Sequence, residues 1–227
     1  MVKYLFIIRS PESLDRDAFK SRIFNDVVPQ LLQLNPQKLK VGITEFAPPR
    51  FTILPLKATG LALVSVWGDF GDASGEWWPE IANMGGSVAG YQVTESTPVA
   101  YDKTWEDGNA SPGAVLLTLM KKNAKLGYEQ FMSEWFGHHT PMAIRIHPLW
   151  NYIRNVVEST ITEDSPPFDG IVEEHFRSLR DITNPARFFG GVFKMLPNML
   201  KVGLHSNKFL DLSATENYLL TEFHIRS

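Results

Sequence analysis

The sequence repeats part of itself at a separation of 112 residues, and this repeat constrains the fold more than any other feature. Residues 14–29 lie over residues 126–141, and the apolar runs at 4–8 and 116–120 precede them at the same separation. The matching positions are Leu14, Phe19, Ser21, Phe24 and Pro29, which recur as Leu126, Phe131, Ser133, Phe136 and Pro141. We therefore expect two copies of one structural unit.

Each copy has the pattern strand, helix, strand, strand, helix, strand. After the aligned helix, strand-like stretches follow at residues 40–45 and 61–67 in the first copy and at 153–158 and 169–175 in the second. Weaker helices near 76–84 and 179–189, and strands near 91–101 and 217–226, complete the units. This is the order of the ferredoxin-like unit. We predict copies at residues 1–102 and 114–227, joined by a turn-rich linker at 103–113.

These units predict an α+β protein in which two ferredoxin-like βαββαβ repeats form a single-chain, pseudo-dimeric α+β barrel with its helices outside. A four-stranded sheet with helices on one face leaves the other face bare, and a second sheet would cover it. The resulting barrel can enclose one small ligand. Association of two chains as a homodimer is left open, because the barrel can close within one chain.

Composition excludes several classes of function. The formal net charge is −3 and no dense basic tract occurs, so neither a nucleic acid nor a membrane is expected as a partner. The chain has no cysteine, which removes thiolate nucleophiles and cysteine-based metal sites. No stretch reaches the roughly 20 apolar residues of a membrane span, and the first residues lack the pattern of a signal peptide. We therefore expect a cytoplasmic protein.

The helix of the second copy carries histidines that the first copy lacks. Phe131, Trp135 and His139 recur at i, i+4 and i+8 and so share a face that is wholly apolar in the first copy. Pro141 cannot donate the hydrogen bond that continues a helix, so we expect a kink or an end beside His139. A histidine at such a break is a candidate site residue. The alternative is a buried core histidine, with the adjacent His138 facing solvent.

A carboxylate and an imidazole alternate on the strand at residues 171–176. The strand period places Glu173 and His175 on one face, and Glu174 on the other face between apolar neighbours. If the barrel encloses a pocket, Glu173 and His175 are candidates for its wall, because such a pair can act in acid–base chemistry. An edge strand with solvated charges is the alternative.

Three motifs of the second copy match the pattern of a known family. Residues 131–141 contain Trp135, His139 and Pro141 in the spacing Trp-x3-His-x-Pro, and Tyr152 with Asn155 follows as Tyr-x-x-Asn. Residues 168–176 form an Asp-Gly strand with a glutamate and a terminal aromatic residue. Over residues 114–190 the chain thus resembles the EthD family of the dimeric α+β barrel superfamily. It departs from that pattern at position 175, where the family has an aromatic residue.

The resemblance implies a barrel that binds a small hydrophobic or aromatic molecule. The leading hypothesis is a lyase, isomerase or cyclase that acts on such a molecule, or on a polyketide-like substrate, by proton transfer without a cofactor. His139 would be the general base or acid, and Glu173 or Tyr152 would orient it or the substrate. The expected substrate-binding residues are Trp135, Phe131, Tyr152, Asn155, His175 and His138.

Two other functions remain open. The protein could bind haem through His139 or His175, or it could be a non-catalytic ligand-binding accessory protein of a degradation pathway. Otherwise no cofactor is expected. No metal is expected either, since the adjacent His138 and His139 diverge on a helix. Residues 191–207 have no counterpart in the first copy and would form a lid over the pocket, a packed surface insertion or a partner contact.

Overall fold

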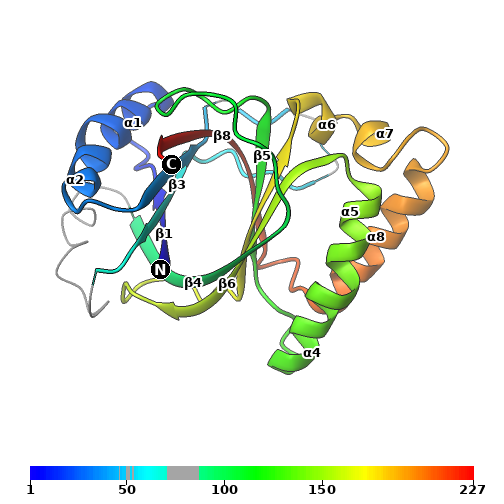
Figure 1. The fold of residues 1–227 in the computed structure, drawn as a ribbon. Helices are drawn as coiled ribbons and strands as arrows, with labels where there is room; N and C mark the ends of the chain where they lie inside the picture. Colours follow the sequence, from blue (N-terminus) through cyan, green and yellow to red (C-terminus); the bar gives the residue numbers. More distant parts are fainter. Residues whose placement is uncertain (46, 50–51, 53, 71–86) are drawn as a thin grey trace.

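A closed barrel of antiparallel strands forms the centre of the molecule (Figure 1). The computed structural model describes residues 1–45, 47–49, 52, 54–70 and 87–227. The eight strands are β1 (Val2–Arg9), β2 (Lys38–Ile43), β3 (Leu61–Gly68), β4 (Ser87–Val99), β5 (Ala114–Met120), β6 (Leu149–Thr160), β7 (Gly170–Phe176) and β8 (Glu216–Arg226). The predicted mixed α and β composition and the closed barrel are confirmed.

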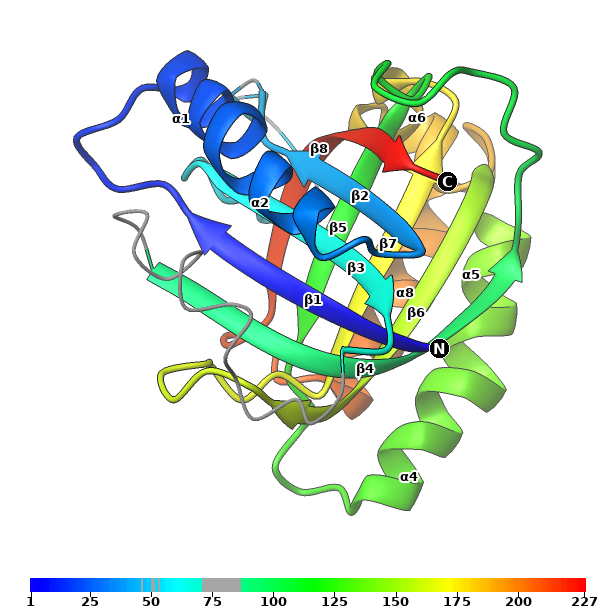
Figure 2. The ribbon, with the colours of Figure 1, turned by 60° about the vertical axis from the view of Figure 1, so that its left-hand side comes forward.

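The strand order is the same in each half of the chain. The first four strands pair as β4-β1-β3-β2 and the last four as β8-β5-β7-β6. The pairs β2·β8 and β4·β6 join the two sets and close the barrel, which Figure 2 shows from the side of β1 and β4. A duplication with boundaries at 1–102 and 114–227 stays a prediction.

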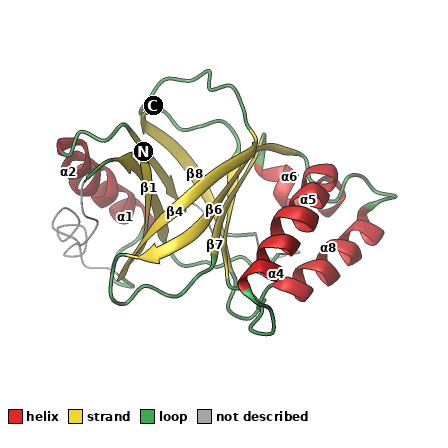
Figure 3. Ribbon diagram, turned by 60° about the horizontal axis from the view of Figure 1, so that its bottom comes forward, coloured by secondary structure: helices red, strands yellow, loops and turns green. Residues whose placement is uncertain are grey.

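The helices lie outside the barrel (Figures 1 and 3). They are α1 (Arg16–Arg22), η1 (Ile23–Val27), α2 (Val28–Gln33), α4 (Tyr128–Met132), η2 (Ser133–His139), α5 (Thr140–Ile146), α6 (Leu179–Thr183), α7 (Pro185–Phe188) and α8 (Met195–Phe209). The helix expected at 76–84 falls outside the described residues. No helix in the described ranges is long and apolar enough to cross a membrane.

The helix that carries Trp135 and His139 continues through Pro141, so of the two expected outcomes, a kink or an end, the end was wrong. The segment η2 is a π-helix, in which the Thr140 N–H bonds to the carbonyl of Trp135, five residues back. We attribute the continuity to this wider turn, which absorbs the missing proline N–H within a continuous helix. The first half has the same arrangement, with a π-helix η1 immediately before α2 and its Pro29.

Successive side chains of each strand point to opposite faces, so the strands contribute to one apolar core inside the barrel and to others between the barrel and the helices. On β5, Leu117 and Leu119 belong to the apolar cluster inside the barrel. Leu116 and Met120 point outward and pack with residues of the second-half helices. The same division holds on β7, and it decides which residues can meet a ligand beneath those helices.

Candidate functional site

A cavity of about 350 Å³ lies outside the barrel, between the outer face of the second-half sheet and the helices that cover it. Its sheet side is formed by β5, β6 and β7, and its helix side by η2 and α8. Met199, Val202 and Ser206 face it from α8, so the segment expected to be a lid, an insertion or a contact forms a wall of the cavity. Among the described lining residues none is Lys or Arg, and the only carboxyl group belongs to Glu174.

Glu174 is the unusual group of this cavity. Its side chain projects from β7 to the helix side and makes no hydrogen bond or ion pair within the described part of the chain. The Glu174 side chain is half-buried: one part borders the cavity, and protein atoms surround the rest. Burial raises the pKa of Glu174 to about 7. The carboxyl group is therefore close to half ionised at neutral pH.

Two hydrogen-bond donors lie beside Glu174. Tyr152 is its direct cross-strand partner on β6 and also lines the cavity. Burial and then the Glu174 carboxylate raise the pKa of Tyr152 far above its usual range, which keeps the phenol protonated. Trp135 is fully buried and lines the cavity. Its Nε1–H lies near the Tyr152 hydroxyl but forms no well-aligned hydrogen bond among the described residues, and a ligand oxygen would satisfy it better.

His139 faces the cavity from the end of η2. Its Nδ1 lies 3.4 Å from Nδ1 of His205 on α8, and the two rings stack with centroids 5.4 Å apart. Burial, followed by the nearby His205 and His147, lowers the pKa of His139 to about 3. The imidazole is thus neutral at physiological pH.

His147, directly after α5, is a second neutral imidazole of the cavity. Its Nδ1 donates to the carbonyl oxygen of Phe188 at 2.8 Å, which leaves Nε2 as the acceptor nitrogen. Burial lowers the pKa of His147 to about 4. The cavity therefore offers acceptors and donors without a permanent charge.

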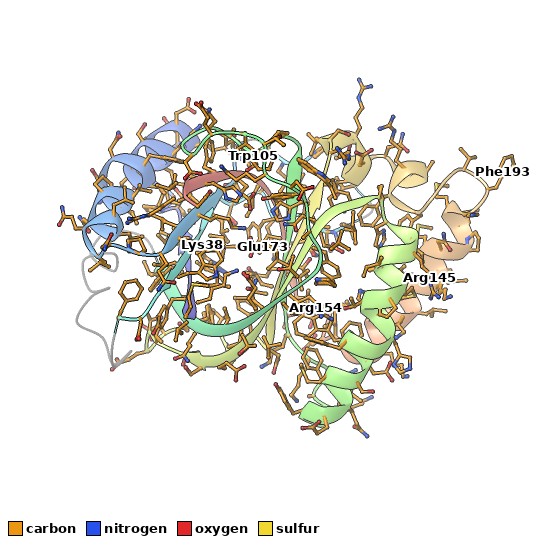
Figure 4. The ribbon with its side chains drawn as sticks, viewed as in Figure 1. Lys38, Trp105, Arg145, Arg154, Glu173 and Phe193 are labelled. Atoms are coloured by element: carbon orange, nitrogen blue, oxygen red, sulfur yellow. The ribbon has the colours of Figure 1, made fainter. Side chains whose placement is uncertain are left out.

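Glu173, one residue before Glu174, points the other way and lies inside the barrel (Figure 4). Its carboxylate is 3.0 Å from Lys40 Nζ and 3.4 Å from Lys3 Nζ. Although burial opposes ionisation, Lys40 and Lys3 lower the pKa of Glu173 to about 2. Asn155 donates to the same carboxylate at 3.2 Å. This carboxylate is held by structural partners.

A second carboxylate continues the ion network inside the barrel. Glu222 lies 2.6 Å from Lys40 and 2.8 Å from Nε2 of His175. Glu173, His175 and Glu222 could together offer ligand atoms to a metal ion. However, the ammonium group of Lys40 already bridges both carboxylates, so a cation would have to displace it. The donor set fits a buried ion network better than a metal site.

The predicted site residues thus divide between four places. Trp135, His139 and Tyr152 line the cavity, which lies outside the barrel and not in its interior as the sequence predicted. The expected pairing of His139 with Glu173 was wrong, because successive side chains of β7 point to opposite faces and Glu173 faces the barrel interior. For the same reason Asn155 and His175 are placed away from the cavity. The other two are Phe131, which is fully buried and packs 5.6 Å from the Trp135 ring, and His138, which is exposed.

Glu174, His147 and His205 were not predicted as site residues. Glu174 could have been found, because an acidic residue between apolar ones on a single strand face is uncommon unless it has a function. His147 follows a helix end and His205 lies in the segment without a counterpart in the first half. Neither position has a local sequence signal.

Comparisons with known proteins support the fold. No family model and no curated protein matches the sequence. Among solved structures, an anthrone oxidase-like protein superposes with a TM-score of 0.65 at 6% identity, covering 100% of this chain and 94% of the other. A "Putative monooxygenase" from Fusobacterium nucleatum subsp. nucleatum superposes with a TM-score of 0.51 at 8% identity, covering 99% of this chain and 93% of the other. These similarities show that the whole chain shares its overall fold with these two structures.

Proposed function

We propose that this protein is a small-molecule enzyme that moves a proton on a neutral, hydrophobic or aromatic substrate without a cofactor. The carrying observation is the Glu174 carboxyl group, which is unpaired within the described chain and stands in an apolar cavity with a pKa of about 7. General acid–base catalysis is most effective when the pKa of the catalytic group is near the working pH. Glu174 thus takes the role that sequence reasoning gave to His139. The EthD resemblance around Trp135 and His139 supports this proposal.

The lining of the cavity favours a neutral substrate. A carboxylate or phosphate group would have no Lys or Arg partner among the described lining residues and would meet Glu174 instead. A cavity of about 350 Å³ is at the small end of the range for ligand sites. The aromatic walls, which include Phe188 and Phe189, suit a flat apolar molecule.

The arrangement supports removal of a proton from a carbon whose carbanion is conjugated with a carbonyl group, either directly or, as in anthrone, through an aromatic ring. Glu174 in its ionised form accepts this proton, and negative charge develops on the carbonyl oxygen. The Tyr152 hydroxyl and the Trp135 Nε1–H are the donors for that oxygen. His139 and His147 are neutral and position polar groups of the substrate.

Hydrogen–deuterium exchange at an acidic carbon tests the proposal directly. Anthrone is a suitable probe, and its exchange can be followed by NMR in deuterated buffer without oxygen. We expect Glu174→Gln to slow the exchange by about 10²-fold or more. The control Glu158→Gln changes an exposed carboxylate on β6 and should leave the rate unchanged. Binding of anthrone without exchange in the unmodified protein would instead favour the accessory-protein hypothesis.

Oxidation of an anthrone-type substrate is a second candidate, favoured by the structural neighbour described as anthrone oxidase-like. It would begin with the same proton removal, followed by reaction of the carbanion with molecular oxygen. An oxygen electrode distinguishes the two functions. Consumption of oxygen that depends on both the protein and Glu174 would favour the oxidase, whereas exchange without oxygen uptake favours isomerisation, cyclisation or elimination.

A further inference from the structure

The outward face of α8 exposes an apolar stripe, although its inward face lines the cavity. Leu196, Leu200 and Leu204 recur every four residues and are 62%, 63% and 65% exposed. Just before the helix, Phe193 is 98% exposed at the tip of the α7–α8 loop, where Figure 4 shows it far from the barrel. Val192 beside it is 72% exposed. Such a contiguous apolar surface is typical of an interaction site.

Positive charges surround the stripe, and acidic residues are missing from it. Residues 182–210 contain four Lys and Arg residues and no Asp or Glu, in a chain whose net charge is −3. Two of these cations have carboxylate partners, on Glu134 and Asp181. Within the described residues Lys194 and Lys201 form no ion pair, nor does the exposed Arg145 on the adjacent α5 (Figure 4).

We propose that this face, defined as Val192, Phe193, Leu196, Leu200 and Leu204, docks on the surface of an anionic lipid bilayer. A helix that lies in a membrane interface has leucine and phenylalanine on one side and lysine and arginine beside them. The unpaired cations complement negative headgroups. The net charge of the whole chain did not predict this surface, because the fold concentrates positive charge here.

The same charges disfavour a second copy of the chain as the occupant. Pairing two α8 helices through their leucines would bring lysines of both copies to one interface. No acidic residue on α8 could compensate for their repulsion. A bilayer supplies both an apolar phase for Phe193 and anionic groups for the lysines.

Docking would place the cavity about one helix diameter, ~10 Å, from the bilayer. An apolar substrate could then pass from the membrane to the cavity without crossing much water. This last consequence rests on the proposed function, whereas the docking itself does not. A binding experiment therefore tests the docking separately from any catalytic assay.

Flotation with lipid vesicles is the direct test. We expect the full chain to float with vesicles of phosphatidylcholine and phosphatidylglycerol in equal parts, and to do so less with phosphatidylcholine alone or at high salt. The triple variant Leu196→Gln/Leu200→Gln/Leu204→Gln should lose about tenfold or more of the binding. The single variants Lys194→Gln and Lys201→Gln should each bind the anionic vesicles about fivefold more weakly.

Matched controls keep this test decisive. Leu32→Gln changes an exposed leucine on α2, on the opposite side of the barrel (Figure 1), and should bind as the unmodified chain does. Circular dichroism would confirm that every variant is folded. Absence of flotation, or flotation unaffected by the triple variant, overturns the proposal. A dimer in sedimentation velocity that the triple variant dissociates would also overturn it, because the occupant would then be a second copy.

Discussion

The raised pKa of Glu174 predicts that this residue makes stability depend on pH. Its pKa is about 7 in the folded chain against an ordinary value of 4.5. Between these values the folded state binds more protons than the unfolded state, so the free energy of unfolding falls as pH rises. At about 1.4 kcal/mol per pH unit, the loss approaches ~3 kcal/mol above pH 7. Water in the cavity would screen the charge and make the loss smaller.

Glu174→Gln isolates this contribution, because the amide does not ionise. We expect the variant to gain about 2–3 kcal/mol relative to the unmodified protein as the pH rises from about 4.5 to 8. Urea denaturation at several pH values measures the difference, and Glu158→Gln controls for the loss of a surface charge. A difference that stays constant within about 1 kcal/mol over this range would refute the reasoning, since Glu174 would then ionise as an ordinary carboxyl group.

The remaining predictions concern the barrel, the packing and the histidine. Lys40→Met removes the ammonium group that bridges two buried carboxylates and should cost about 3–5 kcal/mol in urea denaturation. Lys38→Met, at an exposed position of the same strand, should cost less than about 0.5 kcal/mol, and equal losses would contradict the ion network. Gly170→Ala puts a methyl group 2.6 Å from a carbon of the Trp135 indole and should lower the free energy of unfolding by about 1–3 kcal/mol. The new methyl group of Gly137→Ala meets nothing within 4 Å, so this change should raise that free energy by about 0.5–1 kcal/mol. Thermal unfolding measures both. His139→Gln should leave the midpoint of the pH–rate profile of exchange near 7, and a shift of more than about one pH unit would make the imidazole the titrating group.

The barrel could be predicted from the sequence because its evidence is periodic. Apolar runs 112 residues apart locate the first strand of each half, the later strand-like runs follow in the same order in both halves, and bare sheet faces require a cover. The helix with Trp135 and His139 was found in the same way. The continuation of this helix through Pro141 was not, since the π-helical turn that allows it has no simple sequence pattern.

The choice between Glu173 and Glu174 could not be made from periodicity alone. Alternation shows that the two residues face opposite ways, but both faces of β7 are covered by protein, so apolar neighbours do not identify the cavity side. The partners of Glu173 are Lys3 and Lys40, which lie 170 and 133 residues away in the chain. Contacts over such distances follow from the closed barrel and from no local motif.

Because the two consecutive glutamates of β7 face opposite sides, substitutions on the two faces of this strand have separate effects. Changes at Val172 and Glu174 alter the lining of the cavity and leave the ion pairs inside the barrel untouched. Changes at Glu173 and His175 affect those pairs and leave the cavity lining intact. A deletion of one residue in β7 would exchange the two roles, because every later side chain would move to the other face. Substitutions in this strand can therefore change the cavity lining and the ion network separately, whereas an insertion or deletion would change both.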